Sequence, residues 1–329
     1  MRSEAKGFIL NRVALPVMAA LALLSCSDAM VAPEVAVHDA TPQFLITGNL
    51  QLCSPSGPLT IAAFADANLE VAIRTTLGIT PADDLTYELV SGMALLHANS
   101  SGVTSLVGIE NLTSLKSLSL AFNSISDIGP LQGLTDLRSL LLSGNSISDV
   151  RPLRQLTSLE TLHLSANPLS DLGELRGLTS LTALHLGGNS INDIRPLRQL
   201  TGLITLDLRN NSISDVRALK NLTSLTTLFL NSNSISEIRP LRDLTSLTTL
   251  FLSSNSISDI RVLRRLTSLK FFPLDDNPIS DIRPLRGLMA LNFLYLSGSN
   301  LIDIDQTEWT HRADGPRRIR QLGQRHQRA

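Results

Sequence analysis

Two histidines and one aspartate stand at equal intervals along the chain. His163, His185 and Asp207 are each separated by 22 residues. Imidazole nitrogens and carboxylate oxygens are ligands of Zn²⁺, and the same groups transfer protons in general acid–base catalysis. The three residues lack an adjacent nucleophile, and we expect them on an open surface that does not exclude water. The favoured interpretation is a polar, pH-sensitive part of a binding surface, with a metal site or an acid–base trio as the alternative.

The spacing of this trio belongs to a repeat that organises most of the chain. Each unit follows the pattern L-x-x-L-x-L-x-x-N-x-I-S-D-I-x-P-L-x-x-L-T-S. Its asparagines are Asn123, Asn145, Asn167, Asn189, Asn211, Asn233, Asn255 and Asn277. This pattern is that of the leucine-rich repeat, in which each unit contributes one short strand and a return segment. One unit cannot bury its own apolar face, so stacked units are expected to form one continuous core.

The repeat predicts an α/β-type solenoid, a leucine-rich repeat horseshoe with a parallel concave β-sheet and short irregular or 3₁₀ return arms. Alternate leucines such as Leu162 and Leu164 point inward from each strand. The asparagines also face inward, which requires that their amides bond to neighbouring loop backbones. Degenerate units, with Ser101 and Ser299 at the asparagine position, are expected at the two ends.

The N-terminus has the features of an export signal. Basic residues precede an apolar run, Val13–Leu24, which is shorter than the roughly 20 residues of a membrane-spanning helix. The run ends in Leu23-Leu24-Ser25-Cys26, which resembles a bacterial lipobox. Residues 1–25 are therefore predicted to be a lipoprotein-type signal peptide, with lipid on Cys26. The alternative is an ordinary export signal in which Cys26 is incidental.

Changes in composition divide the rest of the chain. The predicted segments are a linker (26–59), an N-terminal helical cap (60–92), the repeats (93–304) and an arginine-rich, disordered tail (305–329). In the cap, Asp66 is expected to begin a helix that ends at Gly78, and Thr80 to begin a second helix. Such a cap would cover the open edge of the first repeat.

Composition and charge exclude several classes of function. The chain carries 28 basic and 29 acidic side chains, a net charge of −1, so binding to nucleic acid is not expected. Cys26 and Cys53 are its two cysteines, which excludes a disulfide framework and a cysteine-based metal site. No metal and no cofactor is expected, and the chain is predicted to be a monomer.

The 22-residue unit with S-I-S-D-I-x-P-L resembles the internalin-like class of bacterial leucine-rich repeat proteins. The stretches AAFADANLEVAIRTTLGIT and GVTSLVGIENLTSL are similar to the helical cap and first repeat of that class. The resemblance covers residues 60–304 and implies a concave sheet that holds a protein partner. The sequence shows no immunoglobulin-like strand module after the repeats and no sorting motif for wall attachment, so host-cell invasion is not carried over.

The residues that vary between repeats flank the inward leucines and are predicted to lie on the concave surface. Aromatic residues gather there in the C-terminal repeats, namely Phe229, Phe251, Phe271, Phe293 and Tyr295. Because adjacent strands lie about 4.8 Å apart, these side chains are expected to form one binding patch. The alternatives are that the tail covers them or that they have no role. Pro273 is expected to perturb strand pairing nearby.

The return arms carry a column of acidic residues from Asp127 to Asp281, and an arginine follows most of them by two positions. The arginines are Arg151, Arg195, Arg217, Arg239, Arg261 and Arg283. A solvated lattice of ion pairs is the favoured interpretation, with each pair contributing about 0–1 kcal/mol. A face for a polyanion is the alternative.

These patterns together predict a noncatalytic protein–protein interaction module of the bacterial cell envelope. Its partner would bind on the concave face, anchored by the aromatic patch and oriented by Asp207, Arg209, His163 and His185. The chain would be exported and held at a membrane surface by lipid on Cys26, or else secreted. The alternatives are a surface for cell-wall glycans or carbohydrates, a passive envelope spacer, and an enzyme that uses the His-His-Asp trio.

Overall fold

The structure is a computed structural model, and it describes residues 61–301 and 318–320. The predicted signal peptide, Cys26, the linker and most of the tail lie outside these residues, and they stay predictions. Among the described residues, no helix is long and apolar enough to cross a membrane.

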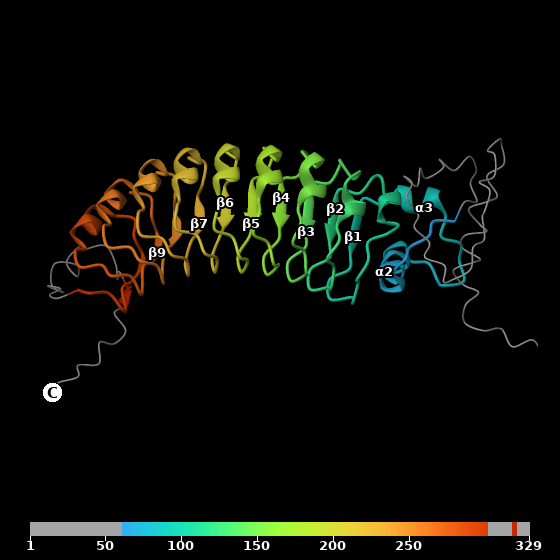
Figure 1. Cartoon of the computed structure of the whole chain (residues 1–329), viewed down its shortest axis with the longest axis horizontal. Coiled ribbons are helices and arrows are strands. Elements are labelled where there is room, and N and C mark those ends of the chain that lie inside the picture. Colours follow the sequence, from blue (N-terminus) through green and yellow to red (C-terminus); the bar gives the residue numbers. More distant parts are fainter. Residues whose placement is uncertain (1–60, 302–317, 321–329) are drawn as a thin grey trace, which may run out of the picture. The chain divides into compact units, whose positions relative to one another are not determined.

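One parallel sheet runs through the described residues and confirms the predicted solenoid. Each strand has three residues and pairs with the strand of the next repeat in the sequence (Figure 1). The strands are β1 (Leu95–His97), β2 (Ser117–Ser119), β3 (Ser139–Leu141), β4 (Thr161–His163), β5 (Ala183–His185), β6 (Thr205–Asp207), β7 (Thr227–Phe229), β8 (Thr249–Phe251), β9 (Phe271–Pro273), β10 (Phe293–Tyr295) and β11 (Arg318–Arg320). From β1 to β10 residues 22 positions apart pair, so the periodicity of the sequence sets the register.

Short 3₁₀ helices form the return arms and lie along the upper side of the array in Figure 1, apart from the strands. They are η2 (Ile109–Asn111), η3 (Gly129–Leu131), η4 (Arg151–Gln155), η5 (Gly173–Gly177), η6 (Arg195–Gln199), η7 (Arg217–Asn221), η8 (Arg239–Asp243), η9 (Arg261–Arg265) and η10 (Arg283–Gly287). Proline occupies an early position in η4, where its fixed φ suits the turn and its missing N–H costs no hydrogen bond. From η3 to η10, an acidic residue stands two positions before the arm's first residue and fixes the turn, as where Asp149 accepts from the Arg151 N–H.

The core consists of stacked columns of leucine and isoleucine between the strands and the return arms. Leu162 and Leu164 have no exposed surface, as predicted, and the corresponding residues of the neighbouring repeats are buried in the same way. Leu153 brings the return arm η4 into the same core. Burial of each such side chain stabilises the fold by about 1.5–3 kcal/mol, and only stacking of the units makes that burial complete.

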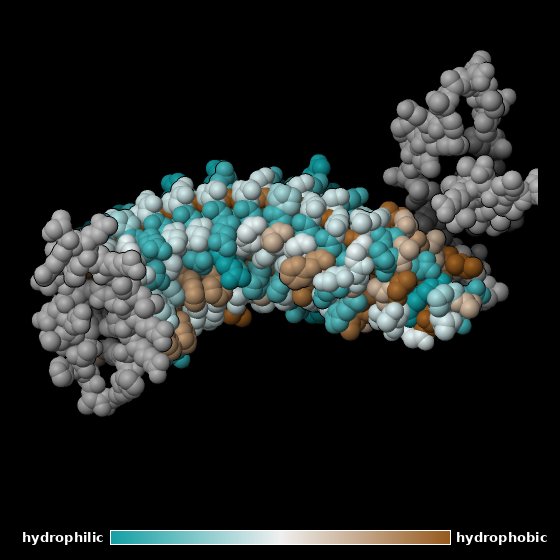
Figure 2. Space-filling model, turned by 90° about the horizontal axis from the view of Figure 1, so that it is seen from below, coloured by the Kyte–Doolittle hydropathy of each residue, from teal (hydrophilic) through white to brown (hydrophobic). Residues whose placement is uncertain are grey.

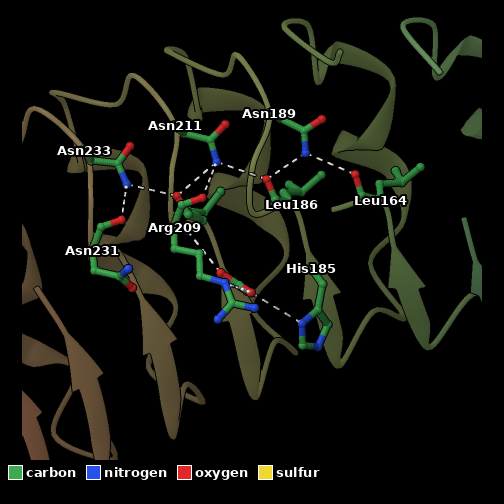
Figure 3. A network of polar contacts seen from close by, with 10 residues as sticks. Leu164, His185, Leu186, Asn189, Arg209, Asn211, Asn231 and Asn233 are labelled. Carbon is green, nitrogen blue, oxygen red and sulfur yellow. Dashed lines mark hydrogen bonds and ion pairs between the residues drawn. The ribbon is translucent and has the colours of Figure 1, made fainter. Parts of the chain in front are cut away.

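The asparagines form a ladder along the turn that follows each strand. The Asn211 side chain accepts from the Ile191 N–H at 3.0 Å and donates to the carbonyls of Leu186 and Leu208, both at 3.0 Å. Figure 3 shows the amide of Asn211 directed toward Leu186. Equivalent bonds recur from Asn123 to Asn277. This confirms that the inward amides bond to loop backbones of neighbouring repeats. Among the described residues, no buried side-chain nitrogen or oxygen lacks a partner.

A left-handed residue precedes each of these asparagines and reverses the chain. Positive φ angles recur at intervals of 22 residues, at Ser100, Phe122, Gly144, Ala166, Gly188, Asn210, Ser232, Ser254, Asp276 and Gly298. Glycine and asparagine adopt this conformation readily, whereas a bulky side chain is strained in it. Phe122, with φ of 59°, is therefore the notable member of the column.

Helices α2 (Ala67–Leu77) and α3 (Tyr87–Ser91) precede the first strand. Asp66 caps α2 as predicted and also accepts from the N–H groups of Thr104 and Ser105, which joins the helix to the first repeat. Burial raises the pKa of Asp66, but these hydrogen bonds outweigh it and lower the pKa to about 2. Gly78 ends α2 in the left-handed conformation, also as predicted.

The predicted start of the second helix at Thr80 is wrong. The Asp83 carboxylate accepts from the Thr80 N–H and hydroxyl and closes a turn, and α3 begins after Thr86. A threonine-proline pair signals a turn as well as a helix start, and here the local Asp83 bonds favour the turn.

At the other end of the sheet, β11 pairs in parallel with β10, and Phe293 lies opposite Arg318. Three residues of the predicted disordered tail therefore form a strand. The rest of the tail lies outside the described residues.

Candidate binding surface

From β1 to β10, the solvent side of the sheet presents the first and third residues of each strand, and we call this surface the sheet face. The middle residue of each of these strands is buried in the core. The third positions of neighbouring strands pair directly, as His163 does with His185 and His185 with Asp207. The next pairs are Asp207 with Phe229 and Phe229 with Phe251. The sequence therefore assigned these residues to the correct column.

Side chains of this column contact one another without interruption across five strands. We call the set the central strip, and its members are His163, His185, Asp207, Arg209, Phe229 and Phe251. The rings of His163 and His185 have centroids 4.1 Å apart, and those of Phe229 and Phe251 5.0 Å apart. Between these ring pairs, Arg209 connects the carboxylate of Asp207 to the ring of Phe229.

Asp207 is the buried member of the central strip, and its side chain is only 2% exposed. Its Oδ1 accepts from the Arg209 N–H at 3.1 Å, and its Oδ2 lies 3.1 Å from Arg209 Nε. A Cβ at Gly187 would come within 3.1 Å of the Asp207 carboxylate, so the glycine leaves room for it. Asp207 can therefore position Arg209, but its carboxylate is covered in this structure.

Arg209 is held in place although half of its side chain is exposed. Its guanidinium carbon lies 5.8 Å from the centroid of the Phe229 ring, within the range of a cation–π contact. Figure 3 shows Arg209 and His185 on the same side of the turns, near the asparagine ladder. The arginine thus presents a charge of fixed orientation beside an apolar ring.

The two histidines and Asp207 do not form a hydrogen-bonded relay. His185 Nδ1 lies 3.9 Å from Asp207 Oδ2, which is too long for a hydrogen bond. Burial lowers the pKa of His163, the charge of His185 lowers it further, and Asp207 acts in the opposite direction. Within residues 61–301 and 318–320, no group of three or more His, Cys, Asp or Glu side chains is arranged to hold a metal ion.

Four of the five aromatic residues form two ring pairs in different columns of the sheet face, and Tyr295 is the fifth. Phe271 and Phe293 stack with centroids 5.0 Å apart and planes at 9°, and both stand at the first position of their strands. Pro273, not an aromatic residue, occupies the place beside Phe251, and Tyr295 lies beyond it. Residue pairing between β8 and β9 is reduced to Thr249 with Phe271, which agrees with the missing N–H of the proline.

The rest of the sheet face is lined mainly by small polar residues, such as Ser139, Thr161, Thr205, Thr227 and Thr249. In Figure 2, the surface seen from below is largely hydrophilic, and its hydrophobic residues form separate areas. The central strip is therefore a local feature on a polar background.

Phe122 is an exposed aromatic residue that the strand columns did not reveal. Its side chain is 68% exposed, and its ring lies so close to Gly144 that a Cβ there would come within 2.6 Å of it. A large apolar side chain in a strained conformation often marks a functional position. The signal was present in the sequence, because Phe122 stands in the column directly before the asparagines, where small residues prevail.

The charged residues of the return arms pair within each repeat. Arg195 Nη2 lies 2.7 Å from Asp193 Oδ2, and the same geometry recurs in five other repeats with Arg151, Arg217, Arg239, Arg261 and Arg283, most loosely at Arg239. Hydrogen bonds from Arg261 lower the pKa of Asp259 to about 2, and those from Arg283 do the same for Asp281. The predicted ion pairs are present, mostly as separate pairs, not as a lattice.

Comparison with family models identifies leucine-rich repeats in the chain. The model for leucine-rich repeats in two copies matches residues 135–177, 179–221 and 223–265, and a single-repeat model matches residues 111–129. A search of curated proteins found no match.

Two solved structures from Listeria monocytogenes are similar to the chain. The structure of an internalin C2 is 35% identical with a TM-score of 0.63, and the match covers 74% of this chain and 99% of that one. A functional domain of InlJ, which includes a cysteine ladder, is 26% identical with a TM-score of 0.63, and the match covers 75% of this chain and 58% of that one. The repeats and the stacked sheet form a fold that is typical of protein-interaction modules. Together with these similarities, they show that the chain belongs to the internalin-like family of leucine-rich repeat proteins.

Proposed function

We propose that the chain is a noncatalytic binding protein that holds a protein partner on its sheet face. The observation that carries this proposal is the central strip, a continuous row of contacting side chains on a polar surface. Repeat solenoids commonly bind partners along such extended surfaces, and aromatic and arginine side chains contribute most at protein interfaces.

The strip combines apolar surface with oriented charge. Phe229 and Phe251 are half-buried, so a partner would remove the remaining ring surface from water, at about 25 cal/mol per Å². Arg209 would donate to a carboxylate or carbonyl of the partner while Asp207 holds it from below. Because the arginine is already oriented, less side-chain entropy would be lost on binding.

The second ring pair, Phe271 with Phe293, and Tyr295 would extend the contact toward the C-terminal repeats. His163 and His185 would form the N-terminal end of the surface. A partner that spans both phenylalanine pairs would cover β7 to β10, and one that also reaches the histidines would cover β4 to β10, which suits an extended protein surface.

We also propose that the chain acts at the bacterial cell envelope. The sequence of residues 1–26 supports export and lipid attachment at Cys26. Growth of the producing cells with a radiolabelled fatty acid tests this. Label on the full-length chain, absent from Cys26→Ser, is expected, and equal labelling or none on both would contradict lipid attachment.

The binding proposal is tested by cross-linking in the envelope, followed by mass spectrometry, with the full chain. The test variant is F229S/F251S, which removes the apolar part of the strip. The matched control is V107S/I204S, which removes two exposed apolar side chains outside the sheet face. Thermal unfolding of all three proteins establishes that they fold equally.

A protein captured by the wild type and the control, but lost from F229S/F251S, is the expected result. Its loss on replacing Arg209 by Ala, with the same folding, would extend the site to the charged part of the strip. Equal capture by all variants would contradict binding on this surface. Release of the captured material by soluble sugars would favour the glycan alternative, and no capture by any protein would favour a passive spacer.

A further inference from the structure

A second column of basic residues runs along the return arms, separate from the arginines that pair with aspartates. We call it the outer basic column. Its members recur every 22 residues in seven successive repeats, and they are Arg154, Arg176, Arg198, Lys220, Arg242, Arg264 and Arg286. All are exposed. Because the basic residues recur with the period of the solenoid, they form a continuous row of positive charge along it.

The geometry of the 3₁₀ helix brings the two basic columns onto one side of the arms. In η6, Arg195 and Arg198 are three residues apart, and side chains at this spacing eclipse one another in a 3₁₀ helix. Arg195 is neutralised by Asp193 through two short contacts. The positive charge that remains on this side therefore belongs to the outer column.

Most of the outer column has no acidic partner. Arg154, Arg176, Arg198, Lys220 and Arg264 make no ion pair among the described residues, and Arg242 lies 3.4 Å from Asp243. Glu174 and Asp243 are the nearest additional acids in these arms. Because the whole chain has a net charge of −1, the column is a local concentration of positive charge and not the effect of a basic protein.

Two residues of the outer basic column, Arg242 and Arg264, line a pocket between η8 and η9. This pocket has a volume of about 370 Å³ and is lined by five arginines, two acidic residues and Val262. One of the acids, Asp259, is already paired with Arg261 at 2.6 Å. Arg242 and Arg265 share Asp243 at 3.4 and 3.5 Å, so Arg264 is the lining arginine without an ion pair among the described residues. The hollow beside it is large enough for an acidic group of a ligand.

We propose that the outer basic column binds a linear acidic polysaccharide, with one acidic group seated in the pocket between η8 and η9. Adjacent strands are about 4.8 Å apart, so successive basic residues follow one another at roughly this distance or slightly more. A sugar chain with closely spaced carboxylates or sulfates matches such a row. The site lies on the return arms, so it leaves the sheet face available for the partner proposed above.

The surroundings of the column favour a polysaccharide over a nucleic acid. Single-stranded nucleic acid is held by aromatic side chains that stack on its bases, as well as by charge. No aromatic residue belongs to the column or lines the pocket. The chemistry available is repeated charge pairing, which recognises acidic groups but not bases.

Direct binding tests this proposal with the full chain and polygalacturonate, heparin and single-stranded DNA of similar length. The test variant is R198Q/K220Q/R264Q, which removes three unpaired charges of the column. The matched control is K116Q/R138Q/K270Q, which removes the same charge from positions that directly precede strands. Affinity is measured at several salt concentrations, because each lost contact reduces the dependence of affinity on salt.

The expected result is binding of polygalacturonate or heparin by the wild type and the control, and at least tenfold weaker binding, with a shallower salt dependence, by the test variant. Preference for polygalacturonate over heparin would assign the acidic groups as carboxylates, and the reverse as sulfates. Equal loss in both variants, equal binding by all three proteins, tighter binding of single-stranded DNA, or no binding at all would each overturn the proposal.

Discussion

Arg209 covers the carboxylate of Asp207: its backbone N–H donates to Oδ1, and its Nε forms an ion pair with Oδ2, each at 3.1 Å. The buried acid and the exposed base come from the same strand end, two residues apart. The buried carboxylate of Asp207 therefore fixes the orientation of the positively charged Arg209 side chain on the surface. A substitution of Asp207 would therefore change the orientation of Arg209, although a partner would not contact Asp207 itself.

Replacing Asp207 by Ala is expected to destabilise the fold by about 1–2 kcal/mol, because it removes one hydrogen bond and one ion pair of a buried carboxylate. Arg209 would lose its orientation at the same time. Urea unfolding measures the first effect. Asp215→Ala is the control, since that carboxylate contacts the backbone N–H and guanidinium of Arg217 in the same way but is 41% exposed instead of 2%. Equal losses in the two variants would contradict the role of burial.

His163 is expected to make the stability of the fold depend on pH. Burial lowers its pKa in the folded state below the ordinary value of 6.5. As the pH falls below 6.5, the unfolded chain therefore takes up the proton first, and stability declines until the pH passes the folded-state pKa. Above the unfolded-state pKa the contribution is fully present.

Comparison of wild type with His163→Gln measures this contribution. The wild type is expected to lose more stability than the variant between pH 7.5 and pH 5.5, because only the wild type carries the titrating imidazole. Both proteins share the carboxylates, so the difference isolates the histidine. Parallel pH dependence in the two proteins would show that burial does not lower its pKa.

Loss of a single amide from the asparagine ladder is expected to lower the free energy of unfolding substantially. Replacing Asn211 by Ala leaves the Ile191 N–H and two carbonyls without their side-chain partner, at a cost of about 2–4 kcal/mol. Asn231→Ala serves as the control, because Asn231 accepts hydrogen bonds through its backbone carbonyl, which the substitution keeps. Its loss is expected to stay below about 0.5 kcal/mol. Chemical denaturation distinguishes the two, and similar losses would contradict the ladder's role.

Replacing Phe122 by glycine is expected to make the fold more stable. Its φ of 59° strains a bulky residue, so Phe122→Gly is expected to stabilise the fold by about 0.5–1 kcal/mol. Phe122→Ala keeps a Cβ at the same angle and is expected to give no gain. The melting temperatures of the two variants separate the backbone from the ring. A loss of stability in both would show that the ring's contact with Gly144 outweighs the strain.

Much of the fold could be predicted from the sequence because the period of 22 residues fixes which residues are neighbours. The register from β1 to β10, the inward leucines and the asparagine bonds all follow from stacking identical units. The second helix could not be placed correctly, because Thr80 and Thr86 both suit a helix start and only the turn closed by Asp83 decides between them.

The sequence by itself determined the columns of the sheet face, since side chains alternate along a strand and repeats stack in register. Only the tertiary structure decided how the members of a column meet. It buries Asp207 beneath Arg209, divides the aromatic residues into two ring pairs, and pairs the return-arm arginines within repeats. The physical reason is that backbone periodicity sets where a side chain starts, whereas its rotamer and its burial depend on the sizes and charges of neighbours from other repeats.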